Sequence, residues 1–456
     1  PGYKFMPAFR NRMWDGKIRL YSQKTKEIYF GLFPYIRAFA EERGYQIVSG
    51  EDVEINNKVD KEIVKKFSNS LGQKFEARDY QIDAIYHSLK FNRALLLSPT
   101  ASGKSFIIYS LIRYYSHLVK DAPNNRILLI VPTTSLVEQM YSDFQSYGWN
   151  VKKNCHRLYS GYSNQTDKKV LISTWQSLYK LPKEYFKQFG CVFGDECHLF
   201  KAKSLSGIMN KCVNAEYRFG MTGTLDGTAT NKLVLEGLFG VTKRVTMTRD
   251  LQEKGTLAKL DISILLLRYH NDVCHWMKGK TYQEEIDYIV TNEKRNRLIT
   301  NLAADQKGNS LVLFQFVEKH GKPLFDMIRD KVGERPVYYV SGEVDAKDRE
   351  QIRGIVEKQK NAIIVASLGT FSTGINIRNL HNIIFASPSK SQVKVLQSIG
   401  RALRMSDDGS VAKLYDIADD FHVKSHKNFT LKHSGERIKI YSKEQFPYNI
   451  FKLDLK

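Results

Sequence analysis

The chain has 456 residues, more than one ordinary domain needs, and 42% of them are hydrophobic, so it can bury several cores. That composition excludes a wholly disordered protein. Lysine and arginine number 70 against 48 aspartates and glutamates, which gives a formal net charge of +22. This charge favours a polyanionic partner, nucleic acid before an anionic membrane surface, unless the basic surface serves solubility alone.

The five cysteines are odd in number and show no CxxC spacing. They predict neither a disulfide framework nor a zinc cluster, and they indicate a reduced, intracellular protein. No apolar run approaches the ~18 residues that cross a bilayer, so we expect no membrane-spanning segment, and we expect no membrane among the partners. The chain starts at Pro1, without a methionine or the apolar core of a signal peptide, so we expect it to be trimmed or to begin inside a longer protein.

Short apolar runs alternate with amphipathic helical patterns from Arg93 onward. Runs that end at polar or turn residues predict buried parallel strands at 93–97, 127–131, 170–173, 191–193 and 219–221. Helices are predicted between several of them, for example at 106–119 and 136–147. After a more polar stretch, the strand pattern resumes at 311–314, 337–340, 362–365, 383–385 and 412–415.

This alternation predicts an α/β protein with two doubly wound parallel sheets in tandem. We expect a small accessory domain at 1–70, a first sheet domain at 71–245, a connection with inserted elements at 246–292, a second sheet domain at 293–425 and a tail at 426–456.

Residues 98–105 read SPTASGKS and lie directly between the strand 93–97 and a helix. A loop at such a junction aims backbone N–H groups and the positive helix end at phosphate oxygens. Lys104 suits the β- and γ-phosphates of ATP and the Ser105 hydroxyl suits Mg²⁺, although Ser98 replaces the first glycine of the general pattern. We expect this loop to bind ATP through Thr100, Ala101, Ser102, Gly103, Lys104 and Ser105. A second GKT at 279–281 follows no strand, so we reject it as a phosphate site.

Asp195 and Glu196 directly follow another strand, and two adjacent carboxylates repel each other unless a cation shares their site. Mg²⁺ bound with ATP is such a cation. Asp195 would hold the metal through water, and Glu196 would orient and deprotonate the attacking water. The alternative is a solvated acidic turn.

Gln397, Arg401 and Arg404 share one face if they lie on a helix, because they are spaced by four and three residues. Two guanidinium groups on one face suit the γ-phosphate, whose charge must be stabilised during transfer. The alternative is a solvated basic face.

Taken in order, these motifs resemble those of superfamily-two helicases of the DExH type. The resemblance is carried by 78–81 (RDYQ), 131–134 (VPTT), 173–176 (STWQ), 195–198 (DECH), 222–224 (TGT), 311–314 (LVLF), 365–377 (VASLGTFSTGINI) and 397–404 (QSIGRALR). It implies tandem RecA-like domains, and it places Arg78 and Gln81 at the nucleotide, with Gln81 on the adenine base. It also implies backbone contacts to nucleic acid from Thr133, Thr134, Trp175, Gln176 and Thr370. Coupling of ATP state to strand movement falls to His198, Thr222 and Thr224, with Gln397 pairing with His198.

A narrower resemblance is to bacteriophage UvsW-type helicases, which remodel branched DNA. It is carried by 11–20 (NRMWDGKIRL), 278–286 (KGKTYQEEI), 340–345 (VSGEVD) and 371–374 (FSTG). It implies an accessory domain whose beginning is missing, and a second GKT that is a feature of the interdomain connection. Asn376 departs from many superfamily-two enzymes, which carry an acidic residue there for the ribose, so nucleotide selectivity stays open.

Residues 1–45 interleave cations with aromatic rings, a pattern that can grip single strands or a junction. We favour instead a small β-domain in which Trp14 and Phe5 form the core, leaving the cations for phosphates. Lys390 and Lys394 are further phosphate candidates.

We therefore expect an ATP-dependent helicase that uses ATP and Mg²⁺, with Lys104, Glu196, Gln397, Arg401 and Arg404 in catalysis and with ATP drawing the two domains together. The resemblance implies DNA junctions, forks and RNA–DNA hybrids as partners in phage replication, recombination and repair. It also implies a monomer in the cytoplasm of an infected bacterial host. The alternatives are an RNA helicase, a motor subunit of a restriction complex and a non-catalytic basic nucleic-acid-binding protein.

Overall fold

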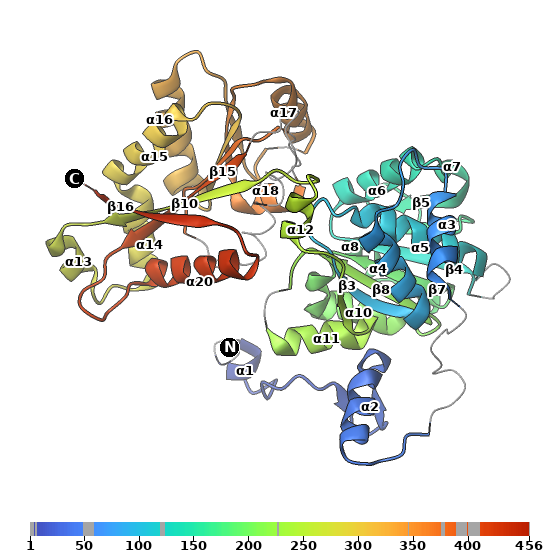
Figure 1. Cartoon of the computed structure of the whole chain (residues 1–456). Coiled ribbons are helices and arrows are strands. Elements are labelled where there is room, and N and C mark those ends of the chain that lie inside the picture. The colour runs from blue at the N-terminus through green and yellow to red at the C-terminus, as the bar shows by residue number, and fades with distance from the viewer. Residues whose placement is uncertain are drawn as a thin grey trace. The chain divides into compact units, whose positions relative to one another are not determined.

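The computed structural model of the chain describes residues 4, 7–48, 59–118, 124–225, 228–344, 346–374, 379–388, 399 and 411–455. The chain divides into two compact units, Pro1–Leu97 with Gly103–Val245 and Ser98–Ser102 with Thr246–Lys456. Each unit contains a sheet of seven described strands with helices packed against it (Figure 1). The prediction of two tandem parallel-sheet domains of the RecA-like type is therefore confirmed.

The sheet of the first unit has the strand order β5-β6-β4-β7-β8-β3-β9, and its described neighbours all pair in parallel. Its strands are β3 (Arg93–Leu97), β4 (Arg126–Val131), β5 (Cys155–Leu158), β6 (Val170–Thr174), β7 (Phe189–Asp195), β8 (Tyr217–Thr222) and β9 (Thr242–Arg244). Five of them lie where apolar runs predicted strands. The carboxyl ends of all seven meet at one edge of the sheet, where the polar residues that follow the strands gather.

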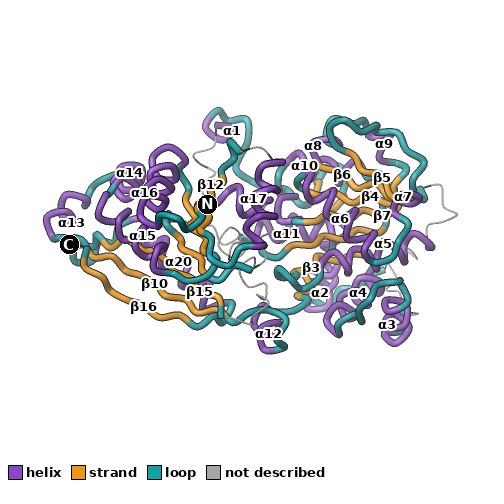
Figure 2. Tube along the Cα trace, turned by 90° about the horizontal axis from the view of Figure 1, so that it is seen from above, coloured by secondary structure: helices purple, strands orange, loops and turns teal. Residues whose placement is uncertain are grey.

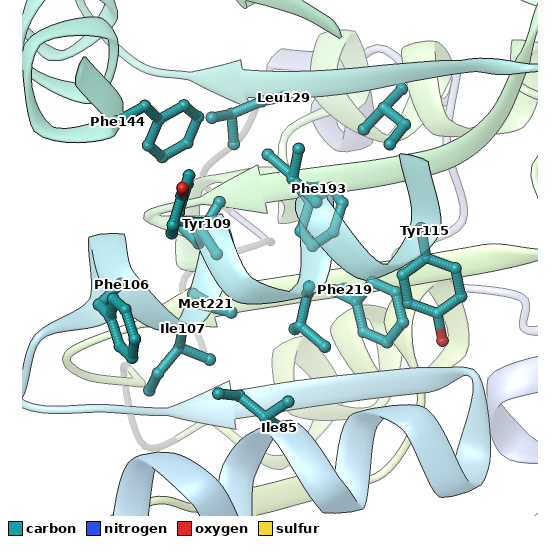
Figure 3. Close-up of a cluster of buried hydrophobic side chains, with 14 of the residues drawn as sticks. Ile85, Phe106, Ile107, Tyr109, Tyr115, Leu129, Phe144, Phe193, Phe219 and Met221 are labelled. Atoms are coloured by element: carbon teal, nitrogen blue, oxygen red, sulfur yellow. The ribbon is translucent and has the colours of Figure 1, made fainter. Parts of the chain in front are cut away.

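The helices of this unit pack against the sheet, and their buried side chains form its cores together with those of the strands. They are α3 (Lys61–Asn69), α4 (Asp79–Phe91), α5 (Lys104–Leu118), α6 (Thr134–Ser146), α7 (Val151–Asn154), α8 (Trp175–Leu178), α9 (Lys183–Phe186), η4 (Cys197–Lys201), α10 (Lys203–Lys211) and α11 (Ala229–Phe239). Figure 3 shows Tyr115 of α5 beside Phe219 of β8, and Tyr109 of the same helix beside Phe144 of α6. This dense packing gives the loop before α5 a rigid support.

The sheet of the second unit has the order β12-β13-β11-β14-β15-β10-β16, and its described neighbours are again all parallel. Its strands are β10 (Leu260–Arg268), β11 (Ser310–Phe314), β12 (Val337–Val340), β13 (Ile363–Ser367), β14 (Asn382–Phe385), β15 (Ala412–Asp420) and β16 (Tyr448–Asp454). Its helices are α12 (Thr248–Glu253), α13 (Asn271–Met277), α14 (Tyr282–Thr291), α15 (Glu293–Asp305), η5 (Val317–Gly321), α16 (Lys322–Val332), α17 (Ala346–Lys358), α18 (Leu368–Gly374) and α20 (Phe429–Lys443).

Two segments that the sequence analysis set apart belong to this second sheet. The expected connection 246–292 contains β10, which pairs with β15 on one side and with β16 on the other. The expected tail 426–456 contains α20 and β16, so it completes the sheet (Figure 2). The second sheet domain is therefore larger than predicted, because strands far apart in the sequence pair with each other.

Strand β15 is clamped from both faces by buried ion pairs. Arg437 of α20 donates hydrogen bonds of 2.7 and 2.8 Å to Asp416, which also accepts one of 2.8 Å from the Tyr441 hydroxyl. Three residues along the strand, and so on its other face, Asp419 accepts bonds of 2.7 and 3.1 Å from Arg295 of α15. Each carboxylate is held by a guanidinium fork, an arrangement that satisfies charge inside a core.

The first 48 residues do not form the expected β-domain. Besides α1 (Pro7–Arg10), η2 (Phe30–Leu32) and α2 (Phe33–Glu42), the described part contains only the hairpin of β1 (Tyr21–Ser22) and β2 (Glu27–Ile28). Trp14 is partly exposed and its Nε1 donates to Lys17 O at 2.8 Å, while Phe5 lies outside the described residues. The described part of this segment packs on the rest of the first unit instead, where Tyr29 lies against a core formed by the sheet and its helices.

That docking runs through α11. A Cβ atom at Gly31 would lie 1.9 Å from Glu236 O, so only glycine allows η2 to approach so closely. The Tyr35 hydroxyl donates a 2.7 Å hydrogen bond to the buried Glu236 carboxylate. Helix α3, which we assigned to the accessory domain, places Val64 in the core of the first sheet. The boundary at residue 70 therefore cuts through the first core.

All five cysteines are buried and unpaired. Among the described residues, no helix combines the length and the apolar character that crossing a bilayer requires.

Candidate active site

Three neighbouring strands of the first sheet bring together Thr222 and the two predicted catalytic residues that the structure describes, Lys104 and Glu196. The order β7-β8-β3 places the carboxyl ends of these strands side by side. Glu196 follows β7, Thr222 ends β8, and the loop that leads to Lys104 follows β3. Residues separated by up to 118 positions thus meet at one edge, as the parallel topology requires.

Lys104 and Glu196 form the centre of this cluster. Lys104 Nζ lies 3.1 Å from Glu196 Oε1, and the two side chains are only 17% and 20% exposed. Burial alone would lower the pKa of Lys104, but the charges of Glu196 and Asp195 outweigh it and raise that pKa. Burial would likewise raise the pKa of Glu196, but Lys104 and then His198 hold it well below its ordinary range. Both groups therefore carry full charge at neutral pH.

The Asp195 carboxylate is suited to binding a cation. It is 3% exposed, and its Oδ1 has no hydrogen-bond partner among the described residues. Burial, and then the charge of Glu196, raise the pKa of Asp195 to about 6. No group of three or more acidic, histidine or cysteine side chains able to hold a metal occurs in the described part of the chain. This donor set fits Mg²⁺ that shares its shell with phosphates and water, rather than an ion caged by protein.

The predicted phosphate loop has a backbone suited to anions. Ala101 and Gly103 both lie in the left-handed region, with φ of 64° and 80°. Alternation of such residues with right-handed ones points successive N–H groups into one concave nest. Ser98 Oγ and Ser102 Oγ lie 2.6 Å apart, and Ser102 Oγ donates to Pro99 O at 2.6 Å. The loop is therefore shaped by its own hydrogen bonds.

Gln81 packs against this loop from α4. A Cβ atom at Gly103 would lie 2.3 Å from Gln81 Nε2, and Gln81 Oε1 accepts a 2.9 Å hydrogen bond from Arg78 N. Arg78 itself donates to the Tyr80 hydroxyl at 2.8 Å. The predicted adenine-reading residue and the predicted phosphate loop thus lie side by side.

Gly103→Ala is expected to weaken ATP binding by about 5- to 30-fold, because an alanine at φ of 80° is strained by ~1–2 kcal/mol and its Cβ presses on Gln81. Ala101→Gly is the matched control: it relieves the same kind of strain and should bind ATP at least as well as the wild type. Equilibrium binding of a fluorescent ATP analogue measures both. Equal affinity in the two variants would contradict the nest assignment.

His198 and Thr222 connect to Glu196 on the side away from Lys104. His198 Nδ1 lies 2.9 Å from Thr222 Oγ1 and 3.3 Å from Glu196 Oε2. Because the Thr222 hydroxyl donates to Thr224 O at 2.9 Å, its oxygen is free to accept from His198, which places the imidazole proton on Nδ1. Of the predicted coupling residues, His198 and Thr222 therefore contact the predicted base, and Thr224 is bonded to Thr222.

The predicted nucleic-acid residues of the first unit also meet at this edge. Thr133 and Thr134 follow β4, while Trp175 and Gln176 follow its neighbour β6. Thr134 and Gln176 are exposed, Trp175 is half-buried, and Thr133 caps α6 through Leu136 N. In the second unit, Thr370 is only 8% exposed and its hydroxyl accepts from Ser367 Oγ at 2.7 Å. Four of the five residues thus remain accessible in part, whereas Thr370 is packed.

Several predicted residues lie outside the described residues: Gln397, Arg401, Arg404, Asn376, Lys390 and Lys394. The second GKT is described, and helix α13 rather than a strand precedes it. Thr281 caps α14 in a capping box with Glu284, so this motif starts a helix. That role agrees with the prediction that the second GKT is not a phosphate site.

One contact of the site was not foreseen. The Ser105 hydroxyl lies 2.8 Å from the Tyr147 hydroxyl, which approaches from the end of α6. Burial raises the pKa of Tyr147 to about 12, so this phenol stays protonated. Nothing in the sequence marks Tyr147, because the two residues meet only through the packing of α5 against α6.

Comparison with known proteins places these features in families. Residues 1–49 match the family described as DNA helicase UvsW, N-terminal; residues 74–227 match Type III restriction enzyme, res subunit; and residues 293–406 match the helicase conserved C-terminal domain. The chain is 38% identical over 469 residues to the ATP-dependent DNA helicase UvsW of Enterobacteria phage T4, a match that covers 98% of this chain and 92% of the relative.

Two solved structures share the fold at low identity. A fragment described as an HsdR subunit of a type I restriction enzyme from Vibrio vulnificus is 15% identical with a TM-score of 0.64, over 92% of this chain and 74% of that one. Dbp5 of S. cerevisiae, bound to RNA and ADP BeF3, is 10% identical with a TM-score of 0.55, over 85% of this chain and 95% of that one.

Proposed function

The chain belongs to the family of UvsW, the ATP-dependent DNA helicase of phage T4, and on this premise we propose that it is an ATP-driven DNA motor whose substrate is branched DNA. The observation that carries the proposal is the buried pair of Lys104 and Glu196, which follow β3 and β7, two parallel strands that flank β8. A phosphate-binding lysine beside an ionised carboxylate suits nucleotide hydrolysis, because the carboxylate can accept a proton from water once the phosphates draw the lysine away.

The ion pair between Lys104 and Glu196 implies that ATP binds before Glu196 can act on the attacking water. The oxygens of a bound triphosphate compete with Glu196 for Lys104, since the ammonium prefers the denser charge of the phosphates. Glu196 then loses its strongest partner and its carboxylate turns to the attacking water as general base. Asp195 and Ser105 would hold Mg²⁺, which when bound neutralises charge on the β- and γ-phosphates.

Thr222 and His198 carry the state of the base toward the DNA side of the sheet edge. Both contact Glu196, so a change in its partner shifts their hydrogen bonds. We assign Thr222, Thr224 and His198 to this coupling, and Thr133, Thr134, Trp175 and Gln176 to the DNA backbone. Gln81 and Arg78, with the loop from Thr100 to Ser105, hold the nucleotide.

From the second RecA-like unit, we assign Arg401 and Arg404 to the γ-phosphate and Gln397 to His198. Two guanidinium groups would stabilise the charge that develops as the terminal bond breaks. Thr370 is the nucleic-acid contact of that unit, once its bond to Ser367 is exchanged for a phosphate. Consumption of ATP and movement on DNA are then one process.

The branched substrates are DNA junctions and forks, with RNA–DNA hybrids as further targets in replication, recombination and repair. The net charge of +22 supports a polyanionic partner of this kind. The protein acts as a monomer in the cytoplasm of the infected host. An RNA helicase is the second candidate, because Dbp5, which shares the fold, was solved with RNA.

A panel of nucleic acids tests this proposal. The rate of ATP hydrolysis by the full chain is measured with single-stranded DNA, linear duplex, forks, four-way junctions, RNA–DNA hybrids and RNA alone. We expect the branched DNA species to give the highest rate at equal nucleotide concentration. Stimulation by RNA alone that equals or exceeds stimulation by branched DNA would favour the RNA helicase, and no turnover with any of them would leave a passive binding protein.

A further inference from the structure

The segment 278–286, KGKTYQEEI, belongs to none of the motifs predicted to bind ATP, and its side chains form a hydrogen-bonded frame. Thr281 Oγ1 accepts from Glu284 N, and Glu284 Oε2 accepts in return from Thr281 N at 2.8 Å. Lys280 Nζ donates to Glu284 Oε1 at 3.1 Å. These bonds fix the turn that leads from α13 into α14.

The next residue of the segment, Glu285, fastens α14 to α20. It is buried, and its Oε1 accepts from Asn428 Nδ2 at 2.8 Å, Thr430 N at 2.7 Å and Thr430 Oγ1 at 2.7 Å. Its Oε2 accepts from Phe429 N at 3.0 Å. A carboxylate here satisfies the free N–H groups at the start of α20 and opposes the positive helix end. The first residue of α20 is thereby held at a fixed place beside α14 (Figure 1).

This frame presents aromatic rings to solvent. Trp276, Tyr282 and Phe429 are 55%, 37% and 41% exposed. Tyr282 and Phe429 lie edge to face with their ring centroids 5.9 Å apart, and Trp276 rests on Tyr288 at 5.5 Å. Exposed rings that are held this firmly offer flat apolar faces at little cost in side-chain entropy.

Cations surround these rings. Lys280 Nζ lies 4.9 Å from the centroid of Trp276, and Lys432 Nζ lies 5.6 Å from that of Phe429. Lys278 and Lys432 are exposed, and no carboxylate of the described chain lies within ion-pair distance of either. The nearby acids Glu284 and Glu285 are already engaged in the frame. The surface formed by Trp276, Lys278, Lys280, Tyr282, Phe429 and Lys432, here called the aromatic platform, therefore carries excess positive charge.

The aromatic platform lies at the functional edge of the second sheet. Helix α13 follows the carboxyl end of β10, and α20 follows that of β15. Thr370 follows β13 at the same edge, four strand spacings from β10, or roughly 19 Å. The platform is thus in reach of a nucleic-acid strand that passes over this edge.

We propose that the aromatic platform binds single-stranded DNA, by stacking bases on Trp276, Tyr282 and Phe429 and pairing phosphates with Lys278 and Lys432. Interleaved rings and cations match unpaired bases on a charged backbone, whereas duplex DNA hides its base faces. An apolar protein partner would leave the two lysines desolvated without counter-charges. The proposal rests on the proposed function, in which strand separation supplies the single strand.

The test is equilibrium binding of a fluorescently labelled oligo(dT) to the full chain without nucleotide, measured by anisotropy. Trp276→Ala and Phe429→Ala should each weaken binding by about 5- to 100-fold, as loss of one base stack does. Lys278→Glu with Lys432→Glu should weaken it further and reduce its dependence on salt. Phe451→Ala, which removes an exposed ring from β16 of the same unit, is the matched control and should bind as the wild type does.

Trp276→Phe separates stacking from folding. It should keep oligo(dT) affinity within about threefold but lose part of the tryptophan quenching on binding, since a phenyl ring still stacks. Thermal melting shows whether the ring variants fold. Folded ring variants that bind oligo(dT) as tightly as the wild type would overturn the proposal, even if the same variants no longer bound a protein partner. The binding measurement needs no ATP, so it tests the aromatic platform separately from the motor function. The motor function is refuted if the wild type does not hydrolyse ATP with any DNA.

Discussion

Replacement of Glu196 by glutamine is expected to reduce DNA-stimulated ATP hydrolysis by about 10²- to 10⁴-fold, the usual contribution of a general base. The amide keeps the size and the hydrogen bonds of the carboxylate but cannot take a proton from water. DNA binding should persist, because the exposed Thr134 and Gln176 belong to other loops. Steady-state phosphate release with saturating junction DNA measures the first effect, and a DNA-binding titration measures the second.

Lys104→Ala should reduce hydrolysis to a similar degree for a different reason. Without the ammonium, Asp195 and Glu196 repel each other and the phosphates, so the affinity for ATP falls as well. Glu184→Gln is the control for both variants, since Glu184 is an exposed carboxylate on α9 of the same unit. Full activity in either site variant would refute the role assigned to that residue.

Asp416→Ala is expected to destabilise the second unit by about 3–5 kcal/mol, because it leaves the Arg437 guanidinium buried without its counter-charge. The Tyr441 hydroxyl loses its acceptor in the same step. Hydrogen exchange of peptides that cover β15 and β10 should accelerate by about 10²- to 4 × 10³-fold, since each 1.4 kcal/mol is a factor of ten, while exchange in the first unit should not change.

Two comparisons isolate the buried charge. Glu253→Ala breaks the exposed pair with Arg249 in the same unit and should cost at most about 1 kcal/mol. The double variant Asp416→Leu with Arg437→Met removes both charges and should recover most of the stability lost in Asp416→Ala. Equal destabilisation by Asp416→Ala and Glu253→Ala would contradict the account of β15.

The sequence predicts most strands because a buried parallel strand is apolar on both faces. Ile127–Val131 and Leu311–Phe314 show this continuous pattern, and β4 and β11 lie there. Strand β10 has a similar pattern but sits in a segment without clear turn signals, and its partners β15 and β16 lie far along the chain. No local rule reveals a pairing of that kind.

Helix α20 was missed for a different reason. Its buried face carries Thr430, Ser434 and Arg437 along with Ile440 and Tyr441, so the apolar period that marks a helix is absent. The helix is held by the carboxylates of Asp416 and Glu285 instead of by a hydrophobic stripe. Only the structure shows that these charges have partners.

The centre of the site was predictable, because Lys104, Asp195 and Glu196 come shortly after apolar runs that end at polar or turn residues. What the sequence could not give is the contact geometry: the ion pair of Lys104 with Glu196, the approach of Gln81 to Gly103, and the bond of Ser105 to Tyr147. Each depends on which strands and helices are neighbours, and neighbour order is not a local property of sequence.

The central claim is that hydrolysis at Lys104 and Glu196 drives the processing of branched DNA. The most direct measurement follows the conversion of a synthetic four-way DNA junction into duplex products by the full chain and by Glu196→Gln, each with ATP and with a non-hydrolysable analogue. We predict conversion only by the wild type with ATP, while both proteins bind the junction. Conversion by Glu196→Gln at the wild-type rate, or by the wild type with the analogue, would contradict the account.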